Sequence, residues 1–178
     1  TAALAALGAH VVAVEVSPAR VARLEENLAR LGLNAETVTA DAIQWRPPAP
    51  VDAVLLDAPC SGTGTLRRHP DIARLKGPGD IAVLTALQDR LLAAAVEMTA
   101  PGGNLVYAAC SLQPEEGPER IAALLAAGAP VARAPVAAAE VFGRADWLSP
   151  DGDLRTLPCH LAELGGMDGF YACRLRRL

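Results

Sequence analysis

Apolar residues follow two different spacings along the chain, and these predict strands that alternate with helices. The segment 10–16, HVVAVEV, is apolar at nearly every position, which is typical of a strand buried on both faces. In 18–31 the apolar residues recur at helical spacing, between Ser17, a favoured N-cap residue, and Gly32, a favoured helix stop. The first quarter of the chain therefore predicts one strand followed by one helix.

The same alternation continues to the end of the chain and predicts an α/β fold. Strands alternating with helices favour a mostly parallel sheet with helices on both faces. We expect Asp80 to cap a helix that the APGG at 100–103 stops. Residues 60–79 are expected to form a loop. The remaining predicted elements are a helix ending before Gly8, helices at 81–99 and 118–127, buried strands at 51–59 and 104–110, an edge strand at 130–136, and further strands at 35–41 and 169–178.

Length, charge and cysteine spacing narrow the class of protein. The 178 residues fit one domain, expected over 1–178, and a net charge of −4 excludes binding of nucleic acid by bulk charge alone. No apolar run reaches the roughly 20 residues that span a bilayer and no secretion signal is present, so we expect a cytoplasmic protein with no membrane partner. The four cysteines form no CxxC pair and no zinc-ligand spacing, which favours free thiols and no metal.

Side chains that can bind a ligand or take part in catalysis stand at the ends of four successive predicted strands. In open α/β sheets, ligands bind at the carboxyl ends of the strands. Glu15 is in position to accept hydrogen bonds from the ribose hydroxyls of a nucleotide or nucleoside cofactor, and Asp41 to reach an adenine amino group. A solvated carboxylate and a turn-forming aspartate are the respective alternatives. Asp57 with Cys60, and then Cys110, occupy the next two strand ends.

Two cysteine segments carry the sharper signal. In 55–69, LLDAPCSGTGTLRRH, a proline stiffens the turn and two glycines let a substrate approach the backbone beside Asp57 and Cys60. Cys110 also follows a buried strand and precedes a helix, and a helix N-terminus lowers the pKa of a nearby thiol. Each cysteine alone could be a small buried hydrophobe. The basic run that follows Cys60 suits RNA phosphates, with a solvated loop as the alternative; it comprises Arg67, Arg68 and His69.

Four segments together resemble a known family. These are DAPCSGTGTLRRHPD at 57–71, YAACSLQPEEG at 107–117, VVAVEVSPARVARLEENLARLGL at 11–33 and LPCHLAELGGMDGFYACRLRR at 157–177. They resemble the Sun-type RNA cytosine-C5 methyltransferases, and the resemblance spans nearly the whole chain. It implies a Rossmann-like class I methyltransferase fold, S-adenosylmethionine as cofactor, and RNA, foremost ribosomal RNA, as substrate.

The resemblance also implies roles for individual residues. Cytosine C5 is a poor nucleophile until a thiolate has added to C6. By resemblance Cys110 is that thiolate, while Cys60 assists removal of the C5 proton and release of the product. Asp57 would bind the N3 and N4 edge of a flipped cytosine. It also joins Glu15 and Asp41 among the expected cofactor-binding acids.

One family feature is missing from the sequence. The family's cofactor loop, ending in APGGK, is expected immediately before Thr1, so we expect the chain to lack the first strand and this loop. The chain alone is then expected to be inactive, to bind cofactor weakly, and to self-associate through the gap that the strand leaves. Two alternatives stay open: a non-catalytic RNA-binding or scaffold module of the same fold, and a DNA cytosine-C5 methyltransferase with Cys60 as nucleophile.

Overall fold

The first 46 residues fold into a unit of their own in the computed structural model, which describes residues 1–178 apart from the side chain of Pro78. Glu15 lies opposite Thr39 at the ends of two parallel strands. Ser17 is the N-cap of the helix between them, and Gly32 ends this helix in the left-handed conformation, φ 66°, as the sequence predicts. The elements of this unit are α1 (Ala2–Ala6), β1 (Val12–Glu15), α2 (Pro18–Leu31) and β2 (Glu36–Thr39).

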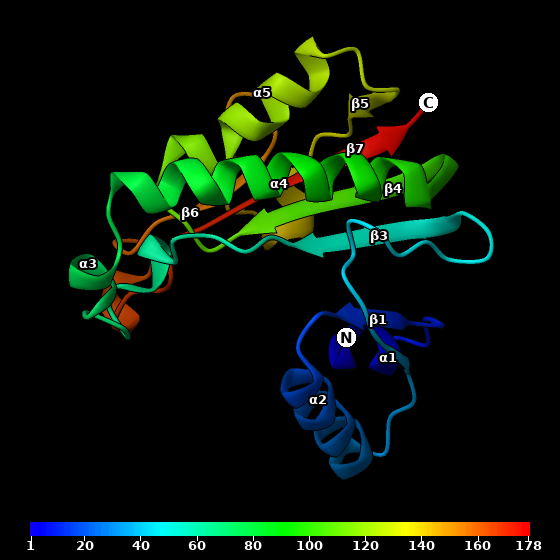
Figure 1. Ribbon diagram of the computed structural model, residues 1–178. Helices are drawn as coiled ribbons and strands as arrows, with labels where there is room; N and C mark the ends of the chain where they lie inside the picture. The colour runs from blue at the N-terminus through cyan, green and yellow to red at the C-terminus, as the bar shows by residue number, and fades with distance from the viewer. The chain divides into compact units, whose positions relative to one another are not determined.

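The second unit, Pro47–Leu178, is built on a mixed sheet (Figure 1). Its strands run in the order β3-β4-β7-β5, and β6 also pairs with β7. The strands are β3 (Val51–Asp57), β4 (Thr99–Ala109), β5 (Val131–Arg133), β6 (Leu154–Thr156) and β7 (Phe170–Arg177). The helices are α3 (Ile72–Leu75), α4 (Pro78–Met98) and α5 (Pro118–Ala126), with short 3-10 turns at Thr63–Thr65, Pro114–Glu116, Ala138–Val141, Ala145–Trp147 and Ala162–Leu164.

The core of the second unit lies between the sheet and its helices. Figure 1 shows α4 lying along β3 and β4, and α4 also contacts α5. Burial of each large apolar side chain contributes about 1.5–3 kcal/mol, so these layers supply most of the stability of the unit. Cys173 is fully buried there. The other fully buried apolar side chains at the centre include Leu92, Leu105, Tyr107, Ile121 and Leu175.

The sheet departs from the predicted mostly parallel arrangement. Only β3 and β4 pair in parallel in this unit, whereas β7 runs antiparallel to β4, β5 and β6. The segment 51–59, predicted to be a buried strand, forms an edge of this sheet, and Leu55 is 53% exposed. Apolar composition alone does not distinguish a central strand from an edge strand, which explains the error.

The predicted start of α4 is also wrong, whereas its end at Met98 lies one residue from the predicted end. The helix begins at Pro78 with Gly77 as N-cap, and the Asp80 carboxylate reaches back to accept a hydrogen bond from the Gly77 N–H at 2.9 Å. Asp80 is therefore the third helical residue and makes one half of a capping box, since a glycine N-cap has no side chain for the other half. At the other end, β4 starts immediately after the helix at Thr99, and residues 100–103 form an irregularity within this strand. The glycines at 102 and 103 permit this bulge, so they do not mark a loop.

Gly64 lies in the first cysteine loop, the loop that carries Cys60, and its backbone holds this loop against the segments of Cys110 and Gly169. The importance of this contact can be tested. Its N–H donates to the Cys110 carbonyl at 3.0 Å, and its carbonyl accepts from the Gly169 N–H at 2.8 Å. A Cβ at position 64 would lie 1.9 Å from the Gly169 carbonyl oxygen. We expect Gly64→Ala to lower the free energy of unfolding by about 3 kcal/mol, measured by urea denaturation followed by circular dichroism.

Gly79→Ala is the matched control for this substitution, because a Cβ at Gly79 meets nothing within 4 Å. Its free energy of unfolding should stay within about 0.5 kcal/mol of the parent value. Equal urea midpoints for the two variants would show that the close approach at Gly64 contributes nothing.

Candidate active site

The two cysteine segments meet because their strands are neighbours. β3 and β4 pair in parallel with Asp57 opposite Ala108, and the ladder continues through the hydrogen bond from Ala58 N–H to the Ala108 carbonyl at 2.9 Å. The chain leaves both strands at the same edge of the sheet. The Sγ atoms of Cys60 and Cys110 lie 3.4 Å apart there, within hydrogen-bond distance for sulfur. The sequence placed both thiols at strand ends, and the structure adds their direct contact.

The contact makes the two thiols chemically unequal. A hydrogen bond from the Cys60 thiol lowers the pKa of Cys110 to about 7, although burial and the nearby charge of Asp57 act in the opposite direction. The same hydrogen bond, followed by burial, raises the pKa of Cys60 above its ordinary value. The lowered pKa of Cys110 and the raised pKa of Cys60 favour Cys110 as the thiolate of the pair and Cys60 as the hydrogen-bond donor.

Asp57 occupies the edge of this site. It is the last residue of β3, it is exposed, and its negative charge is close enough to Cys110 to act on the pKa of that thiol. The structure thus brings three predicted site residues, Asp57, Cys60 and Cys110, to one end of the β3–β4 pair. A carboxylate beside a thiolate and a thiol can serve acid–base and nucleophilic chemistry on a single bound group.

A buried carboxylate under the thiols escaped the sequence analysis. Glu116 is 0% exposed, and its Oε1 accepts hydrogen bonds from Ser61 N–H at 2.8 Å and from Gln88 Nε2 at 3.2 Å. Its Oε2 accepts from the hydroxyls of Ser61 at 2.5 Å and Ser111 at 2.6 Å. The signal that could have revealed it is the repeated Cys-Ser pair at 60–61 and 110–111.

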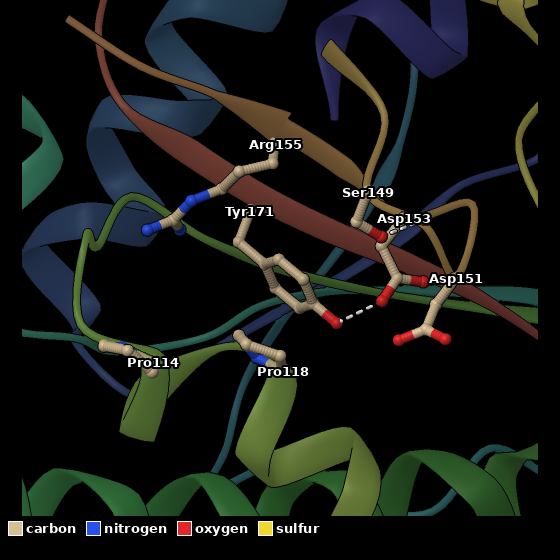
Figure 2. A pocket seen from close by; sticks show the side chains of 7 residues that line it. All are labelled: Pro114, Pro118, Ser149, Asp151, Asp153, Arg155 and Tyr171. Carbon is tan, nitrogen blue, oxygen red and sulfur yellow. Dashed lines mark hydrogen bonds between the residues drawn. The ribbon is translucent and has the colours of Figure 1, made fainter. Parts of the chain in front are cut away.

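Arg155 stabilises the second cysteine loop, the loop that follows Cys110. Arg155 donates from its guanidinium to the carbonyls of Ser111 at 2.8 Å and Leu112 at 2.7 Å. Figure 2 shows Arg155 beside a cavity of about 270 Å³, where the Tyr171 hydroxyl donates to the Asp153 carboxylate at 2.6 Å. The polar side chains of this cavity already have partners: Arg155 donates to the two carbonyls of the Cys110 loop, and Asp153 accepts from Tyr171 and from Arg133. It therefore supports the Cys110 loop structurally.

Glu15 and Asp41, the predicted cofactor-binding acids of the first unit, lie near the carboxyl ends of its two parallel strands. The Ala40 N–H donates to the Glu15 carbonyl at 3.1 Å, which places Asp41 next to the end of β1. Glu15 accepts from Ser17 N–H at 2.8 Å and pairs with an arginine of α2, and Asp41 accepts from Ile43 N–H at 2.9 Å. Both carboxylates thus also make the local cap and turn contacts that were the alternatives to ligand binding.

The predicted basic cluster is partly neutralised. The Arg68 guanidinium donates from Nε and Nη2 to Asp168 Oδ2, at 2.9 and 2.5 Å, and Arg67 lies 3.7 Å from the same carboxylate. The hydrogen bond from Arg68 lowers the pKa of Asp168. The arginine side chains are about half exposed, and exposed ion pairs of this kind contribute little. His69 is exposed beside them.

The described side chains offer no metal centre in the second unit or the first. No three His, Cys, Asp or Glu residues among them lie close enough together to hold an ion. Cys159 is exposed, and the neighbouring His160 Nδ1 accepts a hydrogen bond from Leu157 N–H at 3.2 Å. Within the same described residues, no helix has the length and apolar character needed to cross a membrane.

Curated proteins similar to this chain are ribosomal RNA methyltransferases. Ribosomal RNA small subunit methyltransferase B of Pseudomonas syringae pv. tomato is 43% identical over 171 residues, which cover 94% of this chain and 37% of that protein. The protein of the same name from Sodalis glossinidius is 50% identical over 121 residues, covering 66% of this chain and 28% of its own length. The chain thus spans about a third of the length of the curated relatives it matches.

A solved structure and a family model place the fold and the family. The structure of NSun6 from Pyrococcus horikoshii with SFG superposes with a TM-score of 0.80 at 24% identity, covering 98% of this chain and 44% of that one. This likeness confirms the Rossmann-like class I methyltransferase fold. The family model of 16S rRNA methyltransferase RsmB/F matches residues 1–176, which confirms the resemblance to Sun-type enzymes. The chain belongs to the 16S rRNA methyltransferase RsmB/F family.

Proposed function

We propose that the protein transfers a methyl group from S-adenosylmethionine to C5 of a cytosine in RNA, with ribosomal RNA as the substrate. The observation that carries the proposal is the pair of thiols 3.4 Å apart, one a thiolate near neutral pH and the other a proton donor. Methylation at C5 needs one thiol that adds to C6 and a second group that later removes the C5 proton. The pair supplies both.

Cys110 begins the reaction in this mechanism. Its thiolate forms a bond to C6, and the electrons of the C5–C6 double bond move towards N3 and activate C5. Asp57 faces the N3 and N4 edge: it accepts a hydrogen bond from the N4 amino group, and a proton on its carboxyl group can be donated to N3 as negative charge develops there and returned when the charge leaves. S-adenosylmethionine, when bound, supplies an electrophilic methyl group that the activated C5 takes.

Cys60 ends the reaction. Once the Cys110 sulfur is bonded to C6 it is no longer an anion, so the main cause of the raised pKa of Cys60 disappears. Cys60 can then lose its proton to solvent and take the proton from C5. The electrons of the C5–H bond restore the C5–C6 double bond and expel the Cys110 sulfur as a thiolate. The thiol and thiolate return to their starting states.

The remaining predicted residues bind the two substrates. Glu15 and Asp41 present carboxylate acceptors at adjacent strand ends, which fit the ribose hydroxyls and the adenine amino group of the cofactor. Arg67, Arg68 and His69 follow the Cys60 loop and suit the phosphates that flank an extruded base. Arg68 would exchange Asp168 for a phosphate on binding.

The inequality of the thiols is the first test of these roles. We expect iodoacetamide to alkylate Cys110 with a pH midpoint at about 7, because the thiolate is the reactive form, and to leave Cys60 unmodified at that pH. Peptide mass spectrometry at successive pH values measures both. Cys60→Ala removes the hydrogen bond that stabilises the thiolate, so the Cys110 midpoint should rise. Preferential labelling of Cys60 at pH 7 would reverse the assignment.

Covalent trapping on RNA separates the proposed function from its rivals. In the full-length protein with S-adenosylmethionine, Cys110→Ala should abolish the covalent adduct with cytosine-containing RNA, because the nucleophile is gone. Cys60→Ala should make the adduct accumulate, because release is blocked. Denaturing gel electrophoresis detects both.

Cys159→Ala is the matched control, since that thiol is exposed and belongs to neither cysteine loop. Accumulation in Cys110→Ala and loss in Cys60→Ala would instead favour the chemistry in which Cys60 attacks, as in DNA cytosine methyltransferases. No adduct in any variant, with RNA still bound, would favour a non-catalytic module.

A further inference from the structure

The buried Glu116 carboxylate lies where the two cysteine loops converge. Each cysteine is followed by a serine, and both serine hydroxyls donate to Oε2 of Glu116, at 2.5 Å from Ser61 and 2.6 Å from Ser111. The Ser61 N–H donates to Oε1 at 2.8 Å. One carboxylate therefore holds the residue after Cys60 and the residue after Cys110.

We propose that Glu116 is a positioning residue that keeps the two thiols at hydrogen-bond distance by gripping the serine beside each of them. The proposal rests on the proposed function for its catalytic meaning. Its structural content concerns only the thiol pair, which is present without RNA or cofactor.

The first loop is held on both sides of its cysteine. Gln88 donates from Nε2 to the Pro59 carbonyl at 2.8 Å and to Glu116 Oε1 at 3.2 Å. Pro59 and Ser61 flank Cys60, so both neighbours of the thiol are tied to one buried network. The backbone that carries Cys60 cannot move away from Cys110 without breaking these hydrogen bonds, each costly to lose.

The carboxylate is itself fixed in place. The Tyr107 hydroxyl, fully buried in the core, donates to the Glu116 backbone carbonyl at 2.6 Å. The Ser111 hydroxyl also accepts from the Gln113 N–H at 3.0 Å, which orients it towards the carboxylate. Glu116, which binds both cysteine loops, is therefore anchored to β4 through Tyr107.

Charge does not explain why an acid stands here. The negative charge of Glu116 raises the pKa of both thiols, so it opposes formation of the Cys110 thiolate. What favours the thiolate is the hydrogen bond from Cys60, which requires the two sulfurs to stay aligned. The geometric effect and the charge effect of Glu116 thus have opposite signs, and a substitution separates them.

The experiment is the pH profile of Cys110 alkylation by iodoacetamide in Glu116→Ala. Loss of the grip should separate the thiols and raise the midpoint from about 7 towards the ordinary thiol range near 8.5, which lowers the alkylation rate at pH 7 about 15-fold. Loss of the charge alone would lower the midpoint. Glu115→Ala, the same change at the exposed neighbouring residue, should keep the midpoint at about 7.

A second variant covers the case in which Glu116→Ala does not fold. Ser111→Ala keeps the carboxylate and its charge but removes one grip, and we expect the alkylation rate at pH 7 to fall about threefold. A folded Glu116→Ala with a midpoint at or below the parent value overturns the proposal. If that variant is unfolded, an unchanged midpoint in Ser111→Ala overturns it. Neither measurement uses RNA or cofactor, so failure of the methyl-transfer proposal would be seen separately in the adduct experiment.

Discussion

The parallel register of β3 and β4 is the constraint on which the site depends. Asp57 lies opposite Ala108, so the residues that follow each strand leave the sheet at the same edge, and the two sulfurs come within 3.4 Å. A slip by one residue would send every side chain of β3 to the opposite face, so the apolar packing of the strand against α4 also fixes the register. The contact between the two thiols thus depends on the apolar packing that fixes the register of β3 and β4.

Close contact alone would not give the pair its asymmetry. Two thiols at this distance cannot both ionise without strong repulsion, so the second proton stays and the pair behaves as one unit. A protein that needs a nucleophile and a later base gains from this arrangement, because forming the covalent bond at one sulfur changes the pKa of the other. In the proposed mechanism, this change in pKa separates the attack by Cys110 from the later proton removal by Cys60.

Much of the fold was predictable from the sequence, because local signals and the global fold agree. The Ser17 cap, the Gly32 stop and the alternation of strands and helices gave the α/β class and the ends of α2 correctly. The edge position of β5 was predictable, but the direction of β7 was not, since it depends on which strand β7 joins after a long irregular segment. The start of α4 was missed because Asp80 satisfies a cap from inside the helix.

The same distinction separates the visible part of the site from its hidden part. Cys60 and Cys110 stand at strand ends, where period and turn residues reveal them, whereas Glu116 looks like a solvated acid in a polar QPEEG segment. Only tertiary packing buries Glu116, and a buried carboxylate without hydrogen-bond partners would be very costly. Its four hydrogen bonds must therefore persist for the two cysteine loops to keep this conformation. Gly64 adds a second restraint of the same kind, because its backbone bonds to both the Cys110 loop and Gly169. Two restraints therefore hold the segments that carry the thiols: the hydrogen bonds to the buried Glu116 carboxylate and the close backbone contact at Gly64. Both act on the same segments, so a change in one disturbs the other.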